Sequence, residues 1–189
     1  MKSIAIFIPG IGYHNDKPLL YYSRRMAAQL GYETVGVEYA HMPQKVKGDI
    51  ERMKEAIEIG YRQTEEALTE YEWTEYERIY LVGKSIGTVI AARYAKEHGL
   101  DAKLVLYTPV EATFSYGVQD ARAFIGTKDP WSDLGEVIRM AEQSNVELYR
   151  YEGCNHSLET DDVLMNIEIL TDVMKKTEEF ITCENPAFT

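Results

Sequence analysis

The sequence holds little cysteine and no long hydrophobic run. Cys154 and Cys183 are its only cysteines, too few for a disulfide framework, so we expect two free thiols in a reducing cytoplasm. The apolar run 4–8 is too short for the core of a signal peptide and stops at Pro9-Gly10. No stretch approaches the roughly 20 apolar residues of a transmembrane helix. We therefore predict a soluble cytoplasmic protein without a membrane partner.

Basic residues are also scarce. The chain carries 20 Lys and Arg against 31 Asp and Glu, for a net charge of −11. No basic stripe is available to neutralise phosphates, so nucleic acid is not expected as a partner. The same deficit disfavours adsorption to anionic membranes. A length of 189 residues with 45% hydrophobic side chains suits a single globular domain over residues 1–189.

What the sequence does contain is a regular alternation of apolar runs and helical periods. The apolar runs predict buried strands over 3–8, 34–39, 79–82, 103–107, 122–125 and 146–151. Helices are predicted between them, with Pro18 in the first turn of the first helix and with Asp49, Asp133 and Thr160 as later caps. The alternation predicts an α/β fold, a three-layer α/β/α sandwich with about six parallel strands.

A serine stands between two glycines where the third predicted strand meets the next helix. The segment reads Gly83-Lys84-Ser85-Ile86-Gly87, the layout of a nucleophile elbow. Glycines at such a sharp turn remove the Cβ atoms that would collide with the neighbouring strand and helix. The alternative is a serine that only caps the helix. We interpret Ser85 as a candidate nucleophile, with the Ile86 amide as one donor to an oxyanion.

Among the four histidines, His156 is the best candidate for the base. It lies in the loop between the last predicted strand and the last helix, from which it could reach the end of another strand. His14 is the main rival, because it lies in the first loop over the same sheet edge. His41 falls in a polar loop and His98 at a helix end. An ordinary exposed loop histidine is the other interpretation of His156.

The candidate for the orienting acid is Asp129, which follows the fifth predicted strand directly. A carboxylate there could accept a hydrogen bond from one imidazole nitrogen and fix the tautomer of the base. The alternatives are that Asp129 only begins an Asp-Pro turn, or that Asp133 is the acid. Asp133 fits better as a helix cap.

The order Ser85, Asp129, His156 resembles that of the α/β-hydrolase superfamily over nearly the whole chain, and most of all its small, lidless, dienelactone-hydrolase-like members. The resemblance implies a minimal α/β-hydrolase fold with strand order 2-1-3-4-5-6. It also favours Asp129 over Asp133 and implies a second oxyanion donor in the first loop, with the Ile11 amide as first choice and Gly12 as second.

The residues around this site predict the shape of the pocket. We expect substrate contacts from Gly10, Gly12, Tyr13, Lys84 and Trp131. Lys84 would place a positive charge near the pocket and favour an acidic substrate, or else be a solvated side chain or a surface ion-pair partner. Aromatic residues near the edge would line a cleft, or else pack in the ordinary way. The ten or so residues of 110–119 are too few for a folded lid, so the site should be open and shallow.

No cofactor or metal is expected. The residues Gly83-Lys84-Ser85 resemble the end of a P-loop, but the position of its first glycine is Arg78. Cys154 lacks the partner spacing of a metal site. The sequence predicts a serine hydrolase that cleaves a small carboxylic ester or thioester through an acyl-enzyme. A non-catalytic binding or scaffold protein that kept the fold, and an acyltransferase with the same residues, are the alternatives.

Overall fold

The computed structural model describes residues 2–183 of the chain. Its strands are β1 (Lys2–Ile8), β2 (Glu33–Gly36), β3 (Tyr76–Lys84), β4 (Ala102–Tyr107), β5 (Ala121–Gly126) and β6 (Glu147–Tyr151). Its α-helices are α1 (Pro18–Gln29), α2 (Ile50–Leu68), α3 (Ile86–Glu97), α4 (Leu134–Gln143) and α5 (Val163–Thr182). Two short 3-10 helices, η1 (Trp73–Glu75) and η2 (Glu111–Tyr116), complete the described part of the chain.

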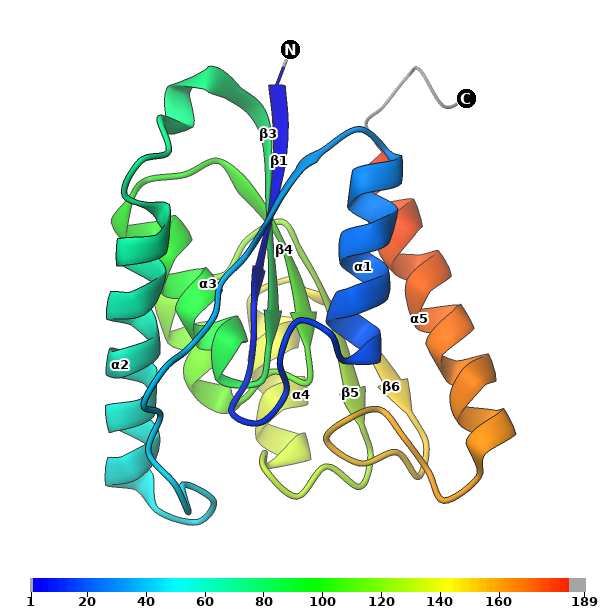
Figure 1. Cartoon of the computed structure of the whole chain (residues 1–189). Coiled ribbons are helices and arrows are strands. Elements are labelled where there is room, and N and C mark those ends of the chain that lie inside the picture. The colour runs from blue at the N-terminus through cyan, green and yellow to red at the C-terminus, as the bar shows by residue number, and fades with distance from the viewer. Residues whose placement is uncertain (1, 184–189) are drawn as a thin grey trace.

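The six strands form one parallel sheet in the order β2-β1-β3-β4-β5-β6, which confirms the expected order. Every strand pair is parallel, so all the carboxyl ends meet at one edge, at the bottom of Figure 1. The loops that follow β1, β3, β5 and β6 are therefore brought together at that edge.

Helices cover both faces of the sheet, as predicted for a three-layer sandwich. Helices α1 and α5 lie on one face, whereas α2, α3 and α4 lie on the other (Figure 1). Each face has its own apolar core, because alternate strand residues point to opposite sides. Ile4, Ile6 and Leu81 pack towards α2, α3 and α4, whereas Phe7 and Val82 pack towards α1 and α5.

The helix caps follow the sequence at two of the three predicted positions. The carboxylate of Asp49 accepts from the Arg52 amide, and that of Asp133 from the Glu136 amide, each at 3.0 Å. The prediction for the last helix is wrong by two residues, because Asp162 is the cap and Oδ1 of its carboxylate accepts two amides of the first turn. The Thr160 hydroxyl instead donates to the side chain of Asn166 at 2.9 Å.

Strand β2 is shorter than predicted. It ends at Gly36 instead of residue 39, and an irregular segment over residues 37–49 leads from it to α2. The Val37 amide still donates to the Phe7 carbonyl at 2.9 Å. The Val37 carbonyl instead accepts from the side-chain amide of Asn15 at 2.7 Å, so a side chain takes the place of the strand partner on the carbonyl side only. Within residues 2–183, no helix is long and apolar enough to cross a membrane.

Candidate active site

Strand β3 delivers Ser85 into a strained turn at the carboxyl edge. Ser85 has φ 57° and ψ −122°, a left-handed value of φ that costs a non-glycine residue roughly 1–3 kcal/mol. The turn is held by the Ser85 amide, which donates to the Tyr107 carbonyl at 3.0 Å. A Cβ on Gly87 would lie 2.1 Å from the Ile8 carbonyl oxygen, so only glycine allows α3 to start this close to β1. The backbone therefore has the geometry expected of a nucleophile elbow.

The side chains of Ser85, His156 and Asp129 form one hydrogen-bonded chain. His156 Nε2 lies 2.8 Å from Ser85 Oγ, and His156 Nδ1 lies 2.7 and 2.9 Å from the two carboxylate oxygens of Asp129. The Asp129 side chain is fully buried and that of His156 is 15% exposed. Asp129 can accept only from a protonated Nδ1, so Nε2 is left to accept the serine proton.

The loops that carry Asp129 and His156 are bound to each other through their backbones. The Lys128 amide donates to the Cys154 carbonyl at 2.9 Å, and the Thr127 amide to the Tyr151 carbonyl at 3.0 Å. The Thr127 hydroxyl accepts from the Gly153 amide at 2.8 Å. Two segments more than 20 residues apart in sequence thus hold the acid and the base in register.

Trp131 packs on the candidate base, and Lys47 packs on Trp131. The rings of Trp131 and His156 are stacked with centroids 5.4 Å apart and planes at 24°. The Trp131 amide donates to Asp129 Oδ1 at 2.9 Å, so the same residue also restrains the acid. Lys47 Nζ lies 5.8 Å from the Trp131 ring. Sequence reasoning missed Lys47, because no local pattern shows that the segment 37–49 reaches across the site.

Lys84 is buried beneath the elbow, which contradicts the expectation of a solvated side chain. Only 1% of the residue is exposed, and its Nζ lies 4.8 Å from the centre of the Tyr13 ring. Burial lowers the pKa of Lys84 to about 7, although the negative charge of Asp129 opposes this shift. Desolvation disfavours the charged ammonium, so Lys84 titrates near neutral pH inside the fold.

The electrostatic environment keeps His156 neutral. Burial is the main cause that lowers its pKa below the ordinary 6.5, and the positive charges of Lys84 and Lys47 act in the same direction. The hydrogen bond and charge of Asp129 oppose them. A neutral imidazole at neutral pH is the form that can accept a proton from a serine.

The first loop brings the backbone of Gly10 close to Ser85. A Cβ on Gly10 would lie 3.0 Å from the Ser85 Cβ, so the two residues are in contact. The amides of Gly10 and Tyr13 are already used, because each donates to the carbonyl of the other. Within residues 2–183, no acceptor is found for the amide of Ile11 or Gly12. The Ile86 amide is the first of α3, where an amide has no partner within the helix. Ile11 and Ile86 stay the predicted oxyanion donors.

The other sequence candidates take several positions. The predicted contact Tyr13 turns inward, is buried, and accepts from the Leu19 amide at 3.1 Å; Tyr107 and Phe114 are also buried, which favours ordinary packing for these three aromatic residues. His14 Nδ1 lies 3.7 Å from an Asp16 carboxylate oxygen and its side chain is 64% exposed, whereas His98 Nε2 is hydrogen-bonded to Glu65 at 2.8 Å. Gly10 and Gly12 line a surface cavity beside the loop.

A family model for the alpha/beta hydrolase domain matches residues 2–182 of this sequence. The chain belongs to this family. The match covers every described strand and α-helix, and the resemblance predicted from the order of the three site residues is confirmed. No curated protein matches the chain.

Solved structures share the fold at low sequence identity. A lidless α/β serine hydrolase from Xanthomonas campestris is 15% identical with a TM-score of 0.69, over 97% of this chain and 83% of that one. Dienelactone hydrolase from Anabaena variabilis is 16% identical with a TM-score of 0.63, over 95% and 85%. An esterase from Pyrococcus furiosus is 15% identical with a TM-score of 0.62, over 96% and 83%. The chain thus has the α/β-hydrolase fold. The connection between β4 and β5 contains a single short helix, the six-residue η2.

Proposed function

We propose that this α/β hydrolase is a serine hydrolase that cleaves a small carboxylic ester or thioester through an acyl-enzyme on Ser85. The observation that carries the proposal is the 2.8 Å contact between Ser85 Oγ and His156 Nε2, with Asp129 on the other imidazole nitrogen. A serine is a weak nucleophile until an adjacent base takes its proton, and this contact supplies the base.

In the first half of the reaction, Ser85 Oγ attacks the carbonyl carbon while its proton passes to His156 Nε2. The Asp129 carboxylate stabilises the imidazolium that forms, and the amides of Ile11 and Ile86 donate to the oxyanion. His156 then gives its proton to the departing alcohol or thiol, and the bond from the carbonyl carbon to that group breaks.

In the second half, water attacks the acyl group on Ser85 and gives a proton to His156. The tetrahedral intermediate collapses to the carboxylic acid, and His156 returns its proton to Ser85 Oγ. The side chains of Trp131 and Asp129 restrain the imidazole throughout, because one stacks on its ring and the other bonds its Nδ1. We also propose that the protein is cytoplasmic, because Cys154 and Cys183 are both free thiols and free thiols are typical of a reducing compartment.

The test is hydrolysis of p-nitrophenyl acetate by the wild-type protein and by Ser85→Ala. The variant should keep the fold and lose turnover by several orders of magnitude, because it lacks the nucleophile. Equal turnover in the two proteins would show that another residue attacks the ester. A wild-type protein that is folded but inert would favour the non-catalytic binding protein. Transfer of the acyl group to an added alcohol instead of to water would favour the acyltransferase.

A further inference from the structure

The loop after β1 makes a tight turn over the end of that strand. The Gly10 amide donates to the Tyr13 carbonyl at 3.2 Å and the Tyr13 amide to the Gly10 carbonyl at 3.3 Å, so residues 10–13 form a closed turn. Gly12 has φ 70° at the third position, where a turn of this kind favours glycine. In the described part of the chain, only the amides of Ile11 and Gly12 within this turn have no acceptor.

Side chains of the turn anchor it on both faces of the sheet. Ile11 packs against the core on the side of α2, α3 and α4, whereas Tyr13 is buried in the core on the side of α1 and α5. The Tyr13 hydroxyl accepts from the Leu19 amide at 3.1 Å, in the first turn of α1, where an amide has no partner within the helix. The turn is therefore held across the end of β1.

Both ends of the turn also contact the elbow that carries the candidate nucleophile. A Cβ on Gly10 would lie 3.0 Å from both the Lys84 carbonyl oxygen and the Ser85 Cβ. At the other end, the Tyr13 ring lies against the Lys84 side chain, with Nζ 4.8 Å from the ring centre. An ammonium at this distance is attracted to the face of an aromatic ring. The turn is thus docked on the elbow through backbone at one end and through a ring at the other.

The two candidate oxyanion donors differ in what holds them. The Ile86 amide is the first of α3, so the helix fixes it, whereas the Ile11 amide belongs to a loop and depends on the contacts of the turn. A donor stabilises an oxyanion only if it is in place before the charge develops. A displacement of about 1 Å can cost roughly 10²-fold in rate.

Resting on the proposed function, we infer that Tyr13 is a positioning residue for the oxyanion hole. Its ring on Lys84 and its hydroxyl on α1 fix the turn 10–13 against the elbow, so that the Ile11 amide is held at the carbonyl oxygen when Ser85 attacks. Tyr13 itself is buried, takes no part in proton transfer and does not touch the substrate.

The test measures hydrolysis of p-nitrophenyl acetate by Tyr13→Leu, which removes the ring, and by Tyr13→Phe, which keeps it. Tyr13→Leu should lower kcat by roughly tenfold or more and leave KM within about twofold, because an oxyanion donor acts in the transition state. Tyr13→Phe should retain most of the activity, since its ring still packs on Lys84.

Tyr32→Leu is the matched control. Tyr32 is buried to the same degree as Tyr13 and belongs to the same core, but it directly precedes β2 and so lies at the amino edge of the sheet. Its loss should lower the melting temperature as the loss of Tyr13 does, because both variants remove a buried ring. The kcat of Tyr32→Leu should equal that of the wild-type protein.

Binding of a trifluoromethyl ketone gives a second readout that a general loss of stability would not change. Ser85 Oγ adds to the ketone carbon, the serine proton passes to His156, and the ketone oxygen becomes the oxyanion of a hemiketal. Tyr13→Leu should weaken binding of the ketone by about the same factor as it lowers kcat. Binding of the corresponding secondary alcohol, which forms no adduct, should be unchanged, and Tyr32→Leu should alter neither.

An equal loss of kcat in Tyr13→Leu and Tyr32→Leu, or an equal loss of ketone and alcohol binding in Tyr13→Leu, would overturn the role of Tyr13. If Tyr13→Leu does not fold, Tyr13→Met takes its place with the same expected results, because its longer side chain fills more of the space. A wild-type protein that neither cleaves the ester nor binds the ketone more tightly than the alcohol would overturn the proposed function, and this role with it. Full activity in Tyr13→Leu, with Ser85→Ala inert, would overturn the role of Tyr13 alone.

Discussion

The two edges of the sheet both gather polar side chains, but they differ in how those side chains are held. At the carboxyl edge, loops from β3, β5 and β6 converge, and three side chains form one buried hydrogen-bonded chain. At the amino edge, a cavity of about 240 Å³ lies among the starts of β3, β4 and β5 and the end of α5.

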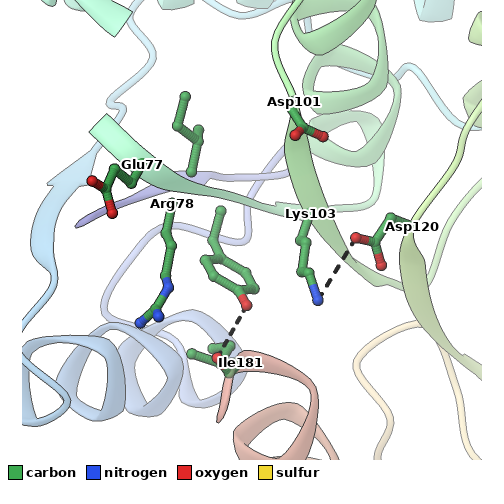
Figure 2. Close-up of a pocket in the computed structure, with 8 residues that line it drawn as sticks. Glu77, Arg78, Asp101, Lys103, Asp120 and Ile181 are labelled. Carbon is green, nitrogen blue, oxygen red and sulfur yellow. Dashed lines mark hydrogen bonds and ion pairs between the residues drawn. The ribbon is translucent and has the colours of Figure 1, made fainter. Parts of the chain in front are cut away.

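The amino-edge cavity is lined by charges of both signs, as Figure 2 shows. Lys103 pairs with Asp120 at 3.7 Å, and the Asp120 side chain is 55% exposed. The Tyr80 hydroxyl donates to the Ile181 carbonyl at 3.0 Å. The first interaction links the starts of β4 and β5, and the second links β3 to α5, so these side chains have structural roles.

The difference shows that a hollow lined with charges is not by itself evidence of an active site. What distinguishes the carboxyl edge is convergence: strained backbone at Ser85, close backbone contact at Gly10, and an imidazole held from two sides. Variants at the two edges should therefore have effects of very different size.

The largest effect should come from His156→Ala. It removes the only group within reach of the Ser85 proton among the described residues, so we expect kcat for p-nitrophenyl acetate to fall by about 10⁴-fold or more. His98→Ala is the control, because His98 lies at the end of α3, stacked on Tyr94. Steady-state kinetics of the two variants checks this, and comparable losses in both would contradict the assignment of the base.

A smaller loss should follow from Gly126→Ala at the end of β5. The new Cβ would lie 2.2 Å from the Cys154 carbonyl oxygen, so the loop that carries His156 must shift. Overpacking of this kind costs about 1–3 kcal/mol, and both melting temperature and activity should fall. Gly135→Ala makes the same change in α4, where the nearest atom is 3.4 Å away, and should not lower stability. Equal melting temperatures would show that the close contact is unimportant.

A change in pH dependence should follow from Lys84→Met, which keeps an apolar stem and removes the charge. The acid limb of kcat/KM reports the His156 pKa, because only neutral imidazole accepts the serine proton. Lys84, with a pKa of about 7, is charged over that limb and lowers the His156 pKa. The limb should therefore move to higher pH in Lys84→Met, by roughly half a unit or more.

The matched control is Lys47→Met, at the other lysine that lowers the His156 pKa. Lys47 is exposed, so solvent screens its charge and the shift should be smaller. An acid limb that stays in place in Lys84→Met, or a larger shift in Lys47→Met, would show that burial of Lys84 does not set the charge balance of the site.

The smallest effect should come from Asp120→Asn at the amino edge. Its ion pair with Lys103 is partly exposed, so the loss should be at most about 1 kcal/mol of stability, and kcat should be unchanged. Chemical denaturation and steady-state kinetics check both values. A strong loss of activity would mean that the two edges are coupled.

Much of this fold could be predicted from the sequence. Uninterrupted apolar runs predicted the buried strands, and Asp49 and Asp133 were identifiable as caps because each precedes a helical period directly. The sequence does not distinguish three residues in a row, 160–162, that can each cap a helix. The structure does, because the Asp162 carboxylate accepts two amides of the first turn whereas the Thr160 hydroxyl donates to Asn166. The strand order came from the resemblance, since periodicity does not show which strands are neighbours.

The site was predictable in part. Chain order and loop positions identified Ser85, Asp129 and His156 as candidates, because polar residues directly after buried strands gather at one edge. The inward turn of Lys84 could have been found by extending the strand by two residues, since it shares a face with Tyr80 and Val82. The contact of Lys47 with Trp131 could not be predicted, because it depends on how a long irregular segment crosses the fold in space.

The most direct test of this account is labelling with a fluorophosphonate followed by mass spectrometry of the adduct. The account predicts one adduct on Ser85 in the wild-type protein and in His98→Ala, and its loss in His156→Ala. An adduct on another residue, or labelling of Ser85 that does not depend on His156, would contradict the claim that these two side chains act together.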